Sequence, residues 1–127
     1  MGLSMKFTID RADLLRSLTH VHSVVERRNT IPILANVLLR ADKDTLSLTT
    51  TDMDLEIVEA VAAKTGTPGS TTVPAHTLYD IVRKLPDGAQ IELKRDAEKE
   101  RLTLSAGQAR FALQTLGPED FPDIAAG

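Results

Sequence analysis

Apolar and polar positions follow several different periods along the chain, and each change of period predicts a new element. The stretch from Lys6 to Ile9 alternates strictly, which is typical of a strand. From Arg11 to about Arg27 the period becomes helical, and Asp10 occupies the place of an N-cap. The apolar face of this helix is spaced by four, three and four residues and consists of Leu14, Leu18, Val21 and Val25.

Strand-like runs follow this predicted helix. Pro32 prevents a simple continuation of the helical pattern. Strands are then predicted at residues 35–41, 45–51 and 55–63. In the last of these runs, Ile57 and Val58 break the alternation, which indicates a β-bulge. The first half of the chain is therefore predicted as βαβββ.

The glycine- and proline-containing stretch at 66–69 separates two halves that repeat the same order of elements. After it come a β-favouring run at 70–73 and a helix that begins near Pro74. The apolar face of this helix consists of Leu78, Ile81, Val82 and Leu85. Three more strands are predicted at 89–95, 101–105 and 108–116. The chain thus reads βαβββ twice, with residues 5–65 and 66–124 as the two halves.

Two segments at the same place in each half also share apolar positions. LSLTTTDMDLEI and LTLSAGQARFAL align without a gap, and this pairs Leu46 with Leu102, Leu48 with Leu104, Leu55 with Phe111, and Ile57 with Leu113. Chance stays an alternative, because Leu-x-Leu is common in β proteins, but the repeated order of elements favours a duplication. Two helices and two antiparallel sheets predict an α+β fold in one domain, with both helices packed on one side of the sheets.

Composition narrows the class of protein further. The 127 residues are 42% apolar and 26% charged, with a formal net charge of −3, which is typical of one soluble globular domain. The absence of cysteine excludes disulfides and thiol chemistry and suits a reducing cytoplasm. No apolar run approaches the roughly 20 residues of a membrane span. Residues 1–4 are expected to be an expression scar before Met5, with a genuine short extension as the alternative.

The first predicted helix also carries a polar stripe opposite its apolar face. Asp13 and Glu26 lie only toward the flanks of this stripe, which ends at Arg27, and Arg28 follows directly. An ordinary solvated helix face is one interpretation of the stripe. The other is a weak, sequence-independent contact with a phosphate backbone. At about 100° per residue, the stripe consists of Arg16, His20, Ser23 and Arg27.

No constellation of side chains predicts catalysis or metal binding. His20 and His22 point about 200° apart on a helix and so do not form a metal motif. Asp52 and Asp54 lie in a predicted turn, where aspartate commonly bonds to the local backbone. Neither a phosphate-binding loop nor a nucleophile elbow occurs. We therefore expect no enzyme, no cofactor and no metal, and keep a metal enzyme that uses Asp52, Asp54 and a histidine as a third alternative.

Five segments, taken in order, are similar to one known family. They are MKFTIDRADLL, TIPILANVLL, LSLTTTDMDLEI, GSTTVPAHTLYDIVRKLP and ARFALQTLGPEDFP, and they cover the chain from Met5 to about Ile124. In this combination they resemble the N-terminal domain of the bacterial sliding-clamp family, the beta subunits of DNA polymerase III. The resemblance implies three such domains per chain and a head-to-tail dimeric ring around double-stranded DNA. Helices would line the hole of this ring, and sheets would form its outer wall.

The resemblance implies a function without catalysis. A clamp of this family slides on DNA and tethers the replicative polymerase, which confers processivity on chromosomal replication in the cytoplasm. Polymerase and clamp loader bind in the other two domains, which this chain lacks. We therefore expect a domain fragment, with a natural one-domain protein as the alternative. The alternative function is that of an α+β structural or interaction domain that never meets DNA.

The resemblance also implies residues that face the DNA. Arg28 takes the place of an arginine that contacts DNA just before the TxPIL run. His76 follows VPA, where the family often has a basic residue, although an imidazole is mostly uncharged near pH 7. The arginines are expected to project from one concave side, with acidic residues elsewhere. The complete DNA-contact set is Arg16, Arg27, Arg28 and Arg83, together with His20 and His76.

A dimer interface is implied as well. The first domain of this family dimerises through its final strands and a nearby helix. Phe111, Leu113 and Ile81 match apolar positions of that surface. Burial of these three side chains in the internal core is the alternative interpretation. If the interface interpretation holds, the isolated domain exposes an apolar edge that favours self-association.

Overall fold

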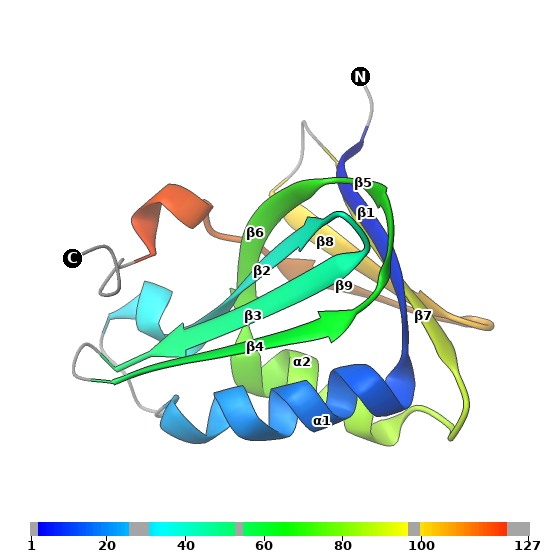
Figure 1. Ribbon diagram of the computed structural model, residues 1–127, viewed down its shortest axis with the longest axis horizontal. Coiled ribbons are helices and arrows are strands. Elements are labelled where there is room, and N and C mark those ends of the chain that lie inside the picture. Colours follow the sequence, from blue (N-terminus) through cyan, green and yellow to red (C-terminus); the bar gives the residue numbers. More distant parts are fainter. Residues whose placement is uncertain (1–2, 26–30, 53–54, 97–99, 122–127) are drawn as a thin grey trace.

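Two antiparallel sheets and two helices make up the part of the chain that the computed structural model describes, residues 3–25, 31–52, 55–96 and 100–121 (Figure 1). The five-stranded sheet has the order β5-β1-β7-β8-β9, and the four-stranded sheet has the order β4-β3-β2-β6. The predicted α+β fold is confirmed. Short 3₁₀ turns cover His22–Val24, Pro32–Ala35 and Pro118–Asp120. The main elements are β1 (Leu3–Asp10), α1 (Arg11–Val21), β2 (Asn36–Asp42), β3 (Thr45–Thr51), β4 (Glu56–Ala62), β5 (Lys64–Thr67), β6 (Gly69–Pro74), α2 (Ala75–Lys84), β7 (Gln90–Asp96), β8 (Arg101–Ala106) and β9 (Ala109–Gln114).

The two predicted halves are interleaved by an exchange of their first strands. β1 of the first half pairs with β7 of the second half, and there Asp10 lies opposite Gln90. β6 of the second half pairs with β2 of the first half, and there Pro74 lies opposite Asn36. In both cases the last residue before one helix lies opposite the first residue of the strand that follows the other helix. This equivalence supports an internal duplication.

Strand β5 is an addition that the sequence pattern does not predict. Its residues pair antiparallel with β1, with Lys6 opposite Thr67 and Thr8 opposite Lys64. The predicted break at 66–69 is therefore wrong in part, because only Pro68 separates β5 from β6. The boundary placed between the two halves, after residue 65, falls inside this strand.

The ladder between β3 and β4 is regular. Its register runs without a shift along the whole of β3, so the bulge predicted at Ile57 and Val58 is wrong. The alternation breaks there because β4 is an edge strand and Val58, 54% exposed, points into solvent. Register shifts occur instead along β1, one of them between Lys6 and Phe7.

Helix α1 ends earlier than the spacing predicts. The α-helix stops at Val21 and a 3₁₀ turn follows, whereas the prediction extends to about Arg27. At this end the carbonyl of Leu18 accepts both from the main-chain N–H of His22 and from Nδ1 of the same residue, the latter at 2.8 Å. Val25 is buried although it lies beyond the helix, which explains why the apolar spacing extends to it.

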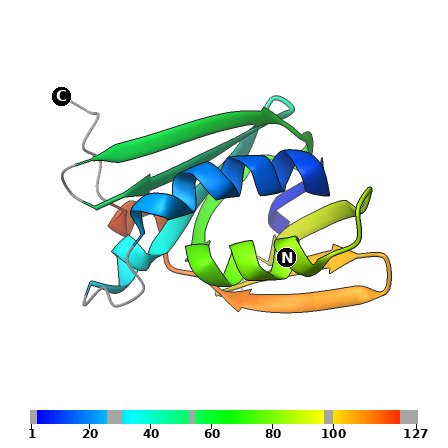
Figure 2. The ribbon, with the colours of Figure 1, turned by 90° about the horizontal axis from the view of Figure 1, so that it is seen from below.

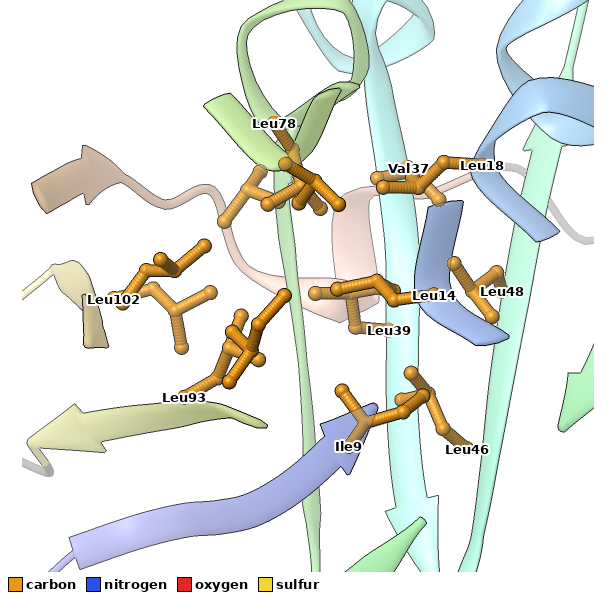
Figure 3. Packing of buried hydrophobic residues seen from close by; sticks show 14 of the residues in the cluster. Ile9, Leu14, Leu18, Val37, Leu39, Leu46, Leu48, Leu78, Leu93 and Leu102 are labelled. Atoms are coloured by element: carbon orange, nitrogen blue, oxygen red, sulfur yellow. The ribbon is translucent and has the colours of Figure 1, made fainter. Parts of the chain in front are cut away.

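One hydrophobic core lies among the two sheets and the two helices (Figure 3). Burial of one leucine or isoleucine side chain there contributes about 1.5–3 kcal/mol. The predicted apolar faces of both helices are buried, except that Ile81 is half-buried at the edge of α2. In the part of the chain that the structure describes, no helix has both the length and the apolar character to cross a membrane. The labelled core side chains are Ile9, Leu14, Leu18, Val37, Leu39, Leu46, Leu48, Leu78, Leu93 and Leu102.

Candidate nucleic-acid interface

The two helices lie side by side on one side of the molecule (Figures 1 and 2). α1 packs across β3 and β4, and α2 packs on β2 and β6. The helices run antiparallel, because Arg11 at the start of α1 contacts the end of α2, and His76 at the start of α2 contacts His22 at the end of α1. Together they present one surface that faces away from the core.

Arg11 joins the start of α1 to the end of α2. Its side chain is 14% exposed, and its Nε donates to the main-chain carbonyl of Val82 at 3.2 Å. Nη2 donates to the carbonyl of Arg83 at 2.9 Å, and Nη1 donates to Oδ1 of Asp87 at 2.8 Å. The bond to Arg83 satisfies a carbonyl in the last turn of α2, where intrahelical donors run out, whereas the carbonyl of Val82 also accepts from the main-chain N–H of Leu85 at 3.2 Å.

Three aromatic rings join the opposite ends of the helices. His22 stacks on Tyr79, with ring centroids 4.0 Å apart and planes inclined by 14°. His76 meets His22 edge-on, with centroids 5.5 Å apart. Nε2 of His76 lies 2.7 Å from the main-chain oxygen of Val25. The sequence pattern does not predict this cluster, because its members belong to different halves of the chain.

The outward face of α1 carries Arg16 and His20. Their side chains are 66% and 57% exposed. Nη2 of Arg16 lies 2.9 Å from Oδ1 of Asp13, three residues earlier. Nδ1 of His20 lies 3.4 Å from Oε1 of Glu59 on β4. Both predicted residues are therefore accessible, and each has a carboxylate beside it.

Helix α2 contributes Arg83 to the same side of the molecule. Its side chain is 54% exposed, with Nη2 3.4 Å from Oδ1 of Asp80 and Cζ 5.7 Å from the ring centroid of Tyr79. The expectation that acids lie elsewhere is wrong, because Asp13 and Asp80 each accompany an arginine. Exposed pairs of this kind contribute about 0–1 kcal/mol, so an arginine can exchange its carboxylate for a phosphate at little cost.

Two of the expected contact residues, Arg27 and Arg28, lie outside the described residues. Val25 is the last described residue before them, and Ile31 is the first described residue after them. Their expected contact with DNA is therefore a prediction from sequence and resemblance.

His76 differs from the other candidates in its orientation. Its Nε2 is engaged with the carbonyl of Val25, and its Nδ1 is buried without a hydrogen-bond partner among the described residues. Neither nitrogen is therefore free to donate to a phosphate in this arrangement. His76 joins the two helices instead of extending their outward face.

An open hollow of about 420 Å³ lies between α2 and β9, where the dimer interface is expected. Ile81 and Phe111 line it, and Phe111 is 38% exposed on the edge strand of the five-stranded sheet. Leu113 is only 3% exposed and belongs to the core, so it does not share this accessible surface. The alternative of internal burial therefore holds for Leu113.

Within the described ranges, no three side chains from histidine, aspartate or glutamate gather closely enough to hold a metal ion. Oδ1 of Asp52 accepts a hydrogen bond from the main-chain N–H of Leu55 at 2.7 Å, as expected of an aspartate in a turn. Asp54 lies outside the described residues. Asp52 thus has a local structural role, because its carboxylate binds the main chain of its own turn.

Known proteins match nearly the whole chain. The family described as DNA polymerase III beta subunit, N-terminal domain, matches residues 5–125. The beta sliding clamp of Caulobacter vibrioides strain NA1000 is 56% identical over 118 residues, which cover 93% of this chain and 32% of that protein. The beta sliding clamp of Escherichia coli strain K12 is 46% identical over 121 residues, which cover 94% of this chain and 32% of that protein.

Solved structures share the fold described above. The DNA polymerase sliding clamp from Caulobacter crescentus has a TM-score of 0.94 at 54% identity, over 97% of this chain and 33% of that chain. The DNA polymerase III subunit beta from Pseudomonas aeruginosa has a TM-score of 0.91 at 44% identity, over 97% of this chain and 33% of that chain. The chain spans about a third of the length of these relatives. From its sequence and its fold, the chain belongs to the family of DNA polymerase III beta subunit N-terminal domains.

Proposed function

We propose that this chain acts as part of a sliding clamp that surrounds duplex DNA and confers processivity on a replicative DNA polymerase, without catalysing a reaction. The observation that carries the proposal is the surface of α1 and α2, two helices that lie side by side (Figure 2) and on which Arg16, His20 and Arg83 are exposed. The relatives named beta sliding clamp support the same role. A place at chromosomal DNA implies the cytoplasm.

The proposed contact with DNA is weak and independent of base sequence. Phosphate contacts release counterions and position a protein, but they carry no sequence information. The chain as a whole has a formal net charge of −3, so only a local cationic surface can attract the phosphate backbone. Arg27 and Arg28 remain part of the proposed contact set. A surface of this kind suits a ring that must slide along DNA.

We infer the protein partners from the family. Residues 5–127 would be one of three domains in a ring of two head-to-tail chains, with polymerase and clamp loader bound at the other two domains. β9 is the edge strand of its sheet and carries Phe111 beside Ile81 of α2. An edge strand offers main-chain groups that a second chain can pair with. Phe111 and Ile81 therefore form the proposed contact with the second chain.

Fluorescence anisotropy of labelled duplex DNA across a salt series tests the DNA contact. We expect weak binding that falls with salt and a slope of log K against log salt that becomes shallower in Arg16→Ala, Arg28→Ala and Arg83→Ala. Each lost phosphate contact lowers that slope by about one. Arg40→Ala is the matched control, because Arg40 is exposed on β2 between buried neighbours and thus faces away from the core.

The outcomes separate the alternatives. Equal effects of all four substitutions would remove the assignment to the helix surface, because binding would then depend on the total charge alone. Undetectable binding at low salt would mean that single contacts are too weak outside a closed ring. The same four substitutions would then be compared in a complete clamp loaded on circular DNA, where a shorter residence time is expected for the helix variants alone.

A further inference from the structure

Three rings hold the end of α1 against the start of α2, and we refer to His22, His76 and Tyr79 as the ring joint. His22 and Tyr79 are stacked with their planes 14° apart, and His22 and His76 are inclined by 84°. The edge-on arrangement is one that aromatic pairs prefer, and the stacked rings, with centroids 4.0 Å apart, are in direct contact. The ring joint is therefore specific packing between the helices.

Hydrogen bonds orient both imidazoles of the ring joint. Nδ1 of His22 lies 2.8 Å from the carbonyl oxygen of Leu18, and Nε2 of His76 lies 2.7 Å from that of Val25. A carbonyl oxygen only accepts, so each of these ring nitrogens must carry a proton. Nδ1 of His76 is buried without a partner among the described residues, so Nε2 makes the hydrogen bond that orients this ring.

The ring joint also touches the surface proposed to face DNA. Arg83 lies one helical turn after Tyr79, and its Cζ is 5.7 Å from the ring centroid of that residue. Arg16 lies on α1, so the joint, together with the link made by Arg11 at the other end, fixes how far the two arginines are from each other. Phosphates follow each DNA strand at regular intervals, so cations on two helices meet the same duplex only at a set spacing.

We propose that His76 is a positioning residue for this surface and not a phosphate contact. Its hydrogen bond to the carbonyl of Val25 and its contact with His22 hold α1 and α2 in one placement, in which Arg16 and Arg83 bind together. A pair of helices that is already ordered loses less entropy on binding. The inference rests on the proposed function, because it concerns how the DNA-facing surface is built.

Two substitutions of His76 separate the hydrogen bond from the ring. His76→Gln keeps a side-chain N–H donor that can reach the carbonyl of Val25, whereas His76→Leu removes the donor. Without this donor, a smaller fraction of molecules has both helices in the placement that binds DNA. The apparent affinity falls in proportion to that fraction. We expect His76→Leu to weaken duplex binding about fivefold, and His76→Gln to stay within about twofold of the wild type, which is the range that one hydrogen bond provides.

NMR titration of the ¹⁵N-labelled chain with duplex DNA at low salt follows the side chains of the DNA-facing surface and the rings of the joint in one experiment. We expect the side-chain signals of Arg16 and Arg83 to shift, while the ring nitrogens of His76 report a proton on Nε2 before and after DNA is added. Ring signals of His76 that move as far as those of Arg16 would identify a direct contact and overturn the positioning role. Equal losses of affinity in His76→Gln and His76→Leu would overturn it as well.

Failure of the inference and failure of the proposed function give different results. If the side-chain signals of Arg16 and Arg83 do not shift in the wild type, the assignment of the DNA-facing surface is wrong, and the positioning role of His76 is wrong as well. If these signals shift to the same extent in His76→Leu, the assignment of the surface is retained and only the positioning role is wrong. Should His76→Leu not fold, Tyr79→Leu removes the stacking on His22 and leaves His76 in place. The same loss of affinity is expected there, and unchanged affinity would overturn the inference.

Discussion

Nε of Arg11, in the first turn of α1, donates a hydrogen bond to the main-chain carbonyl of Val82, in the last turn of α2, across 3.2 Å. At the opposite end of the pair, Nε2 of His76 in α2 donates to the carbonyl of Val25, beyond the end of α1, across 2.7 Å. Each helix therefore uses a side chain from its own start to bind a carbonyl at the end of the other. This reciprocal arrangement makes the two helices one structural unit.

Replacement of Arg11 by methionine tests this link. Methionine keeps much of the apolar stem but removes the side-chain donor to the carbonyl of Arg83 and one of the two donors to the carbonyl of Val82, which also accepts from the main-chain N–H of Leu85. We expect the free energy of unfolding to fall by about 2–3 kcal/mol, because hydrogen bonds from charged groups contribute about 1.5–3 kcal/mol each and are not fully additive. Urea denaturation measures this loss. Arg16→Met, at an exposed position, should stay within about 0.5 kcal/mol of the wild type, and an equal loss there would contradict the role of Arg11.

Thr50 links the end of α1 to the four-stranded sheet. Its buried hydroxyl donates to the main-chain carbonyl of Val21 at 2.5 Å. Thr50→Val keeps the shape and removes the donor, so we expect a loss of about 1–2 kcal/mol in the free energy of unfolding. Thr49→Val is the matched control, because Thr49 is the neighbouring residue of β3 and its side chain lies on the opposite, half-buried face. If both substitutions have the same effect, the hydrogen bond adds nothing beyond strand propensity.

Elements with an apolar face could be predicted from the sequence, because burial imposes a period. The pattern predicts β3 with the bounds Thr45–Thr51 that the structure has. β5 has no such period, since Lys64–Thr67 lies at the edge of a sheet and is held by main-chain pairing, which residues of many types can provide. The end of α1 could not be predicted either. Val25 keeps the helical spacing yet reaches the core from extended backbone, at φ −89° and ψ 119°.

The residues of the candidate site also divide into those that the sequence predicts and those that it does not. Arg16 and Arg83 could be found because an amphipathic helix exposes the side chains opposite its apolar face. Contacts between distant segments could not be found. Asp10 does occupy the N-cap position, but its carboxylate makes no capping bond and accepts from Nε2 of Gln90 instead. The place of His76 after VPA predicts a contact with DNA, and nothing in that local pattern indicates that the carbonyl of Val25 accepts a hydrogen bond from it.

The hairpin between β2 and β3 contains a strained lysine. Lys43 has φ 50° and Asp44 has φ 59°, and the side chain of Asp44 also accepts a hydrogen bond from the main-chain N–H of Thr65 at 3.0 Å. Asparagine adopts positive φ more readily than lysine, so Lys43→Asn should stabilise the chain by about 0.5–1 kcal/mol in thermal or urea unfolding. Asp44→Gly relieves the same strain but loses the bond to Thr65, so it should gain less. A larger gain in Asp44→Gly would show that this bond contributes little.

Leu113 and Phe111 lie two residues apart on the same face of β9, but they differ in burial and are expected to respond differently to truncation. Leu113→Ala opens a cavity in the core and should lower the free energy of unfolding by about 2–4 kcal/mol. Phe111 is 38% exposed, so Phe111→Ala should cost less than half as much stability. In a complete clamp that carries this domain, Phe111→Ala should instead weaken the association of the two chains, which sedimentation equilibrium measures. A dimer constant that does not change in Phe111→Ala would remove this residue from the proposed interface.

Asp80 competes with DNA for Arg83 in the proposed function. Oδ1 of Asp80 lies 3.4 Å from Nη2 of Arg83, at an exposed position where a pair of charges is worth about 1 kcal/mol. Asp80→Asn should therefore strengthen duplex binding about three- to fivefold at low salt, and the gain should shrink as salt screens both interactions. Asp42→Asn changes the net charge equally at an exposed residue of β2, on the face that points away from the core, and should leave affinity within about twofold of the wild type. Equal gains in both variants would show that only the total charge matters, and the surface of α1 and α2 would then have no special role in holding DNA.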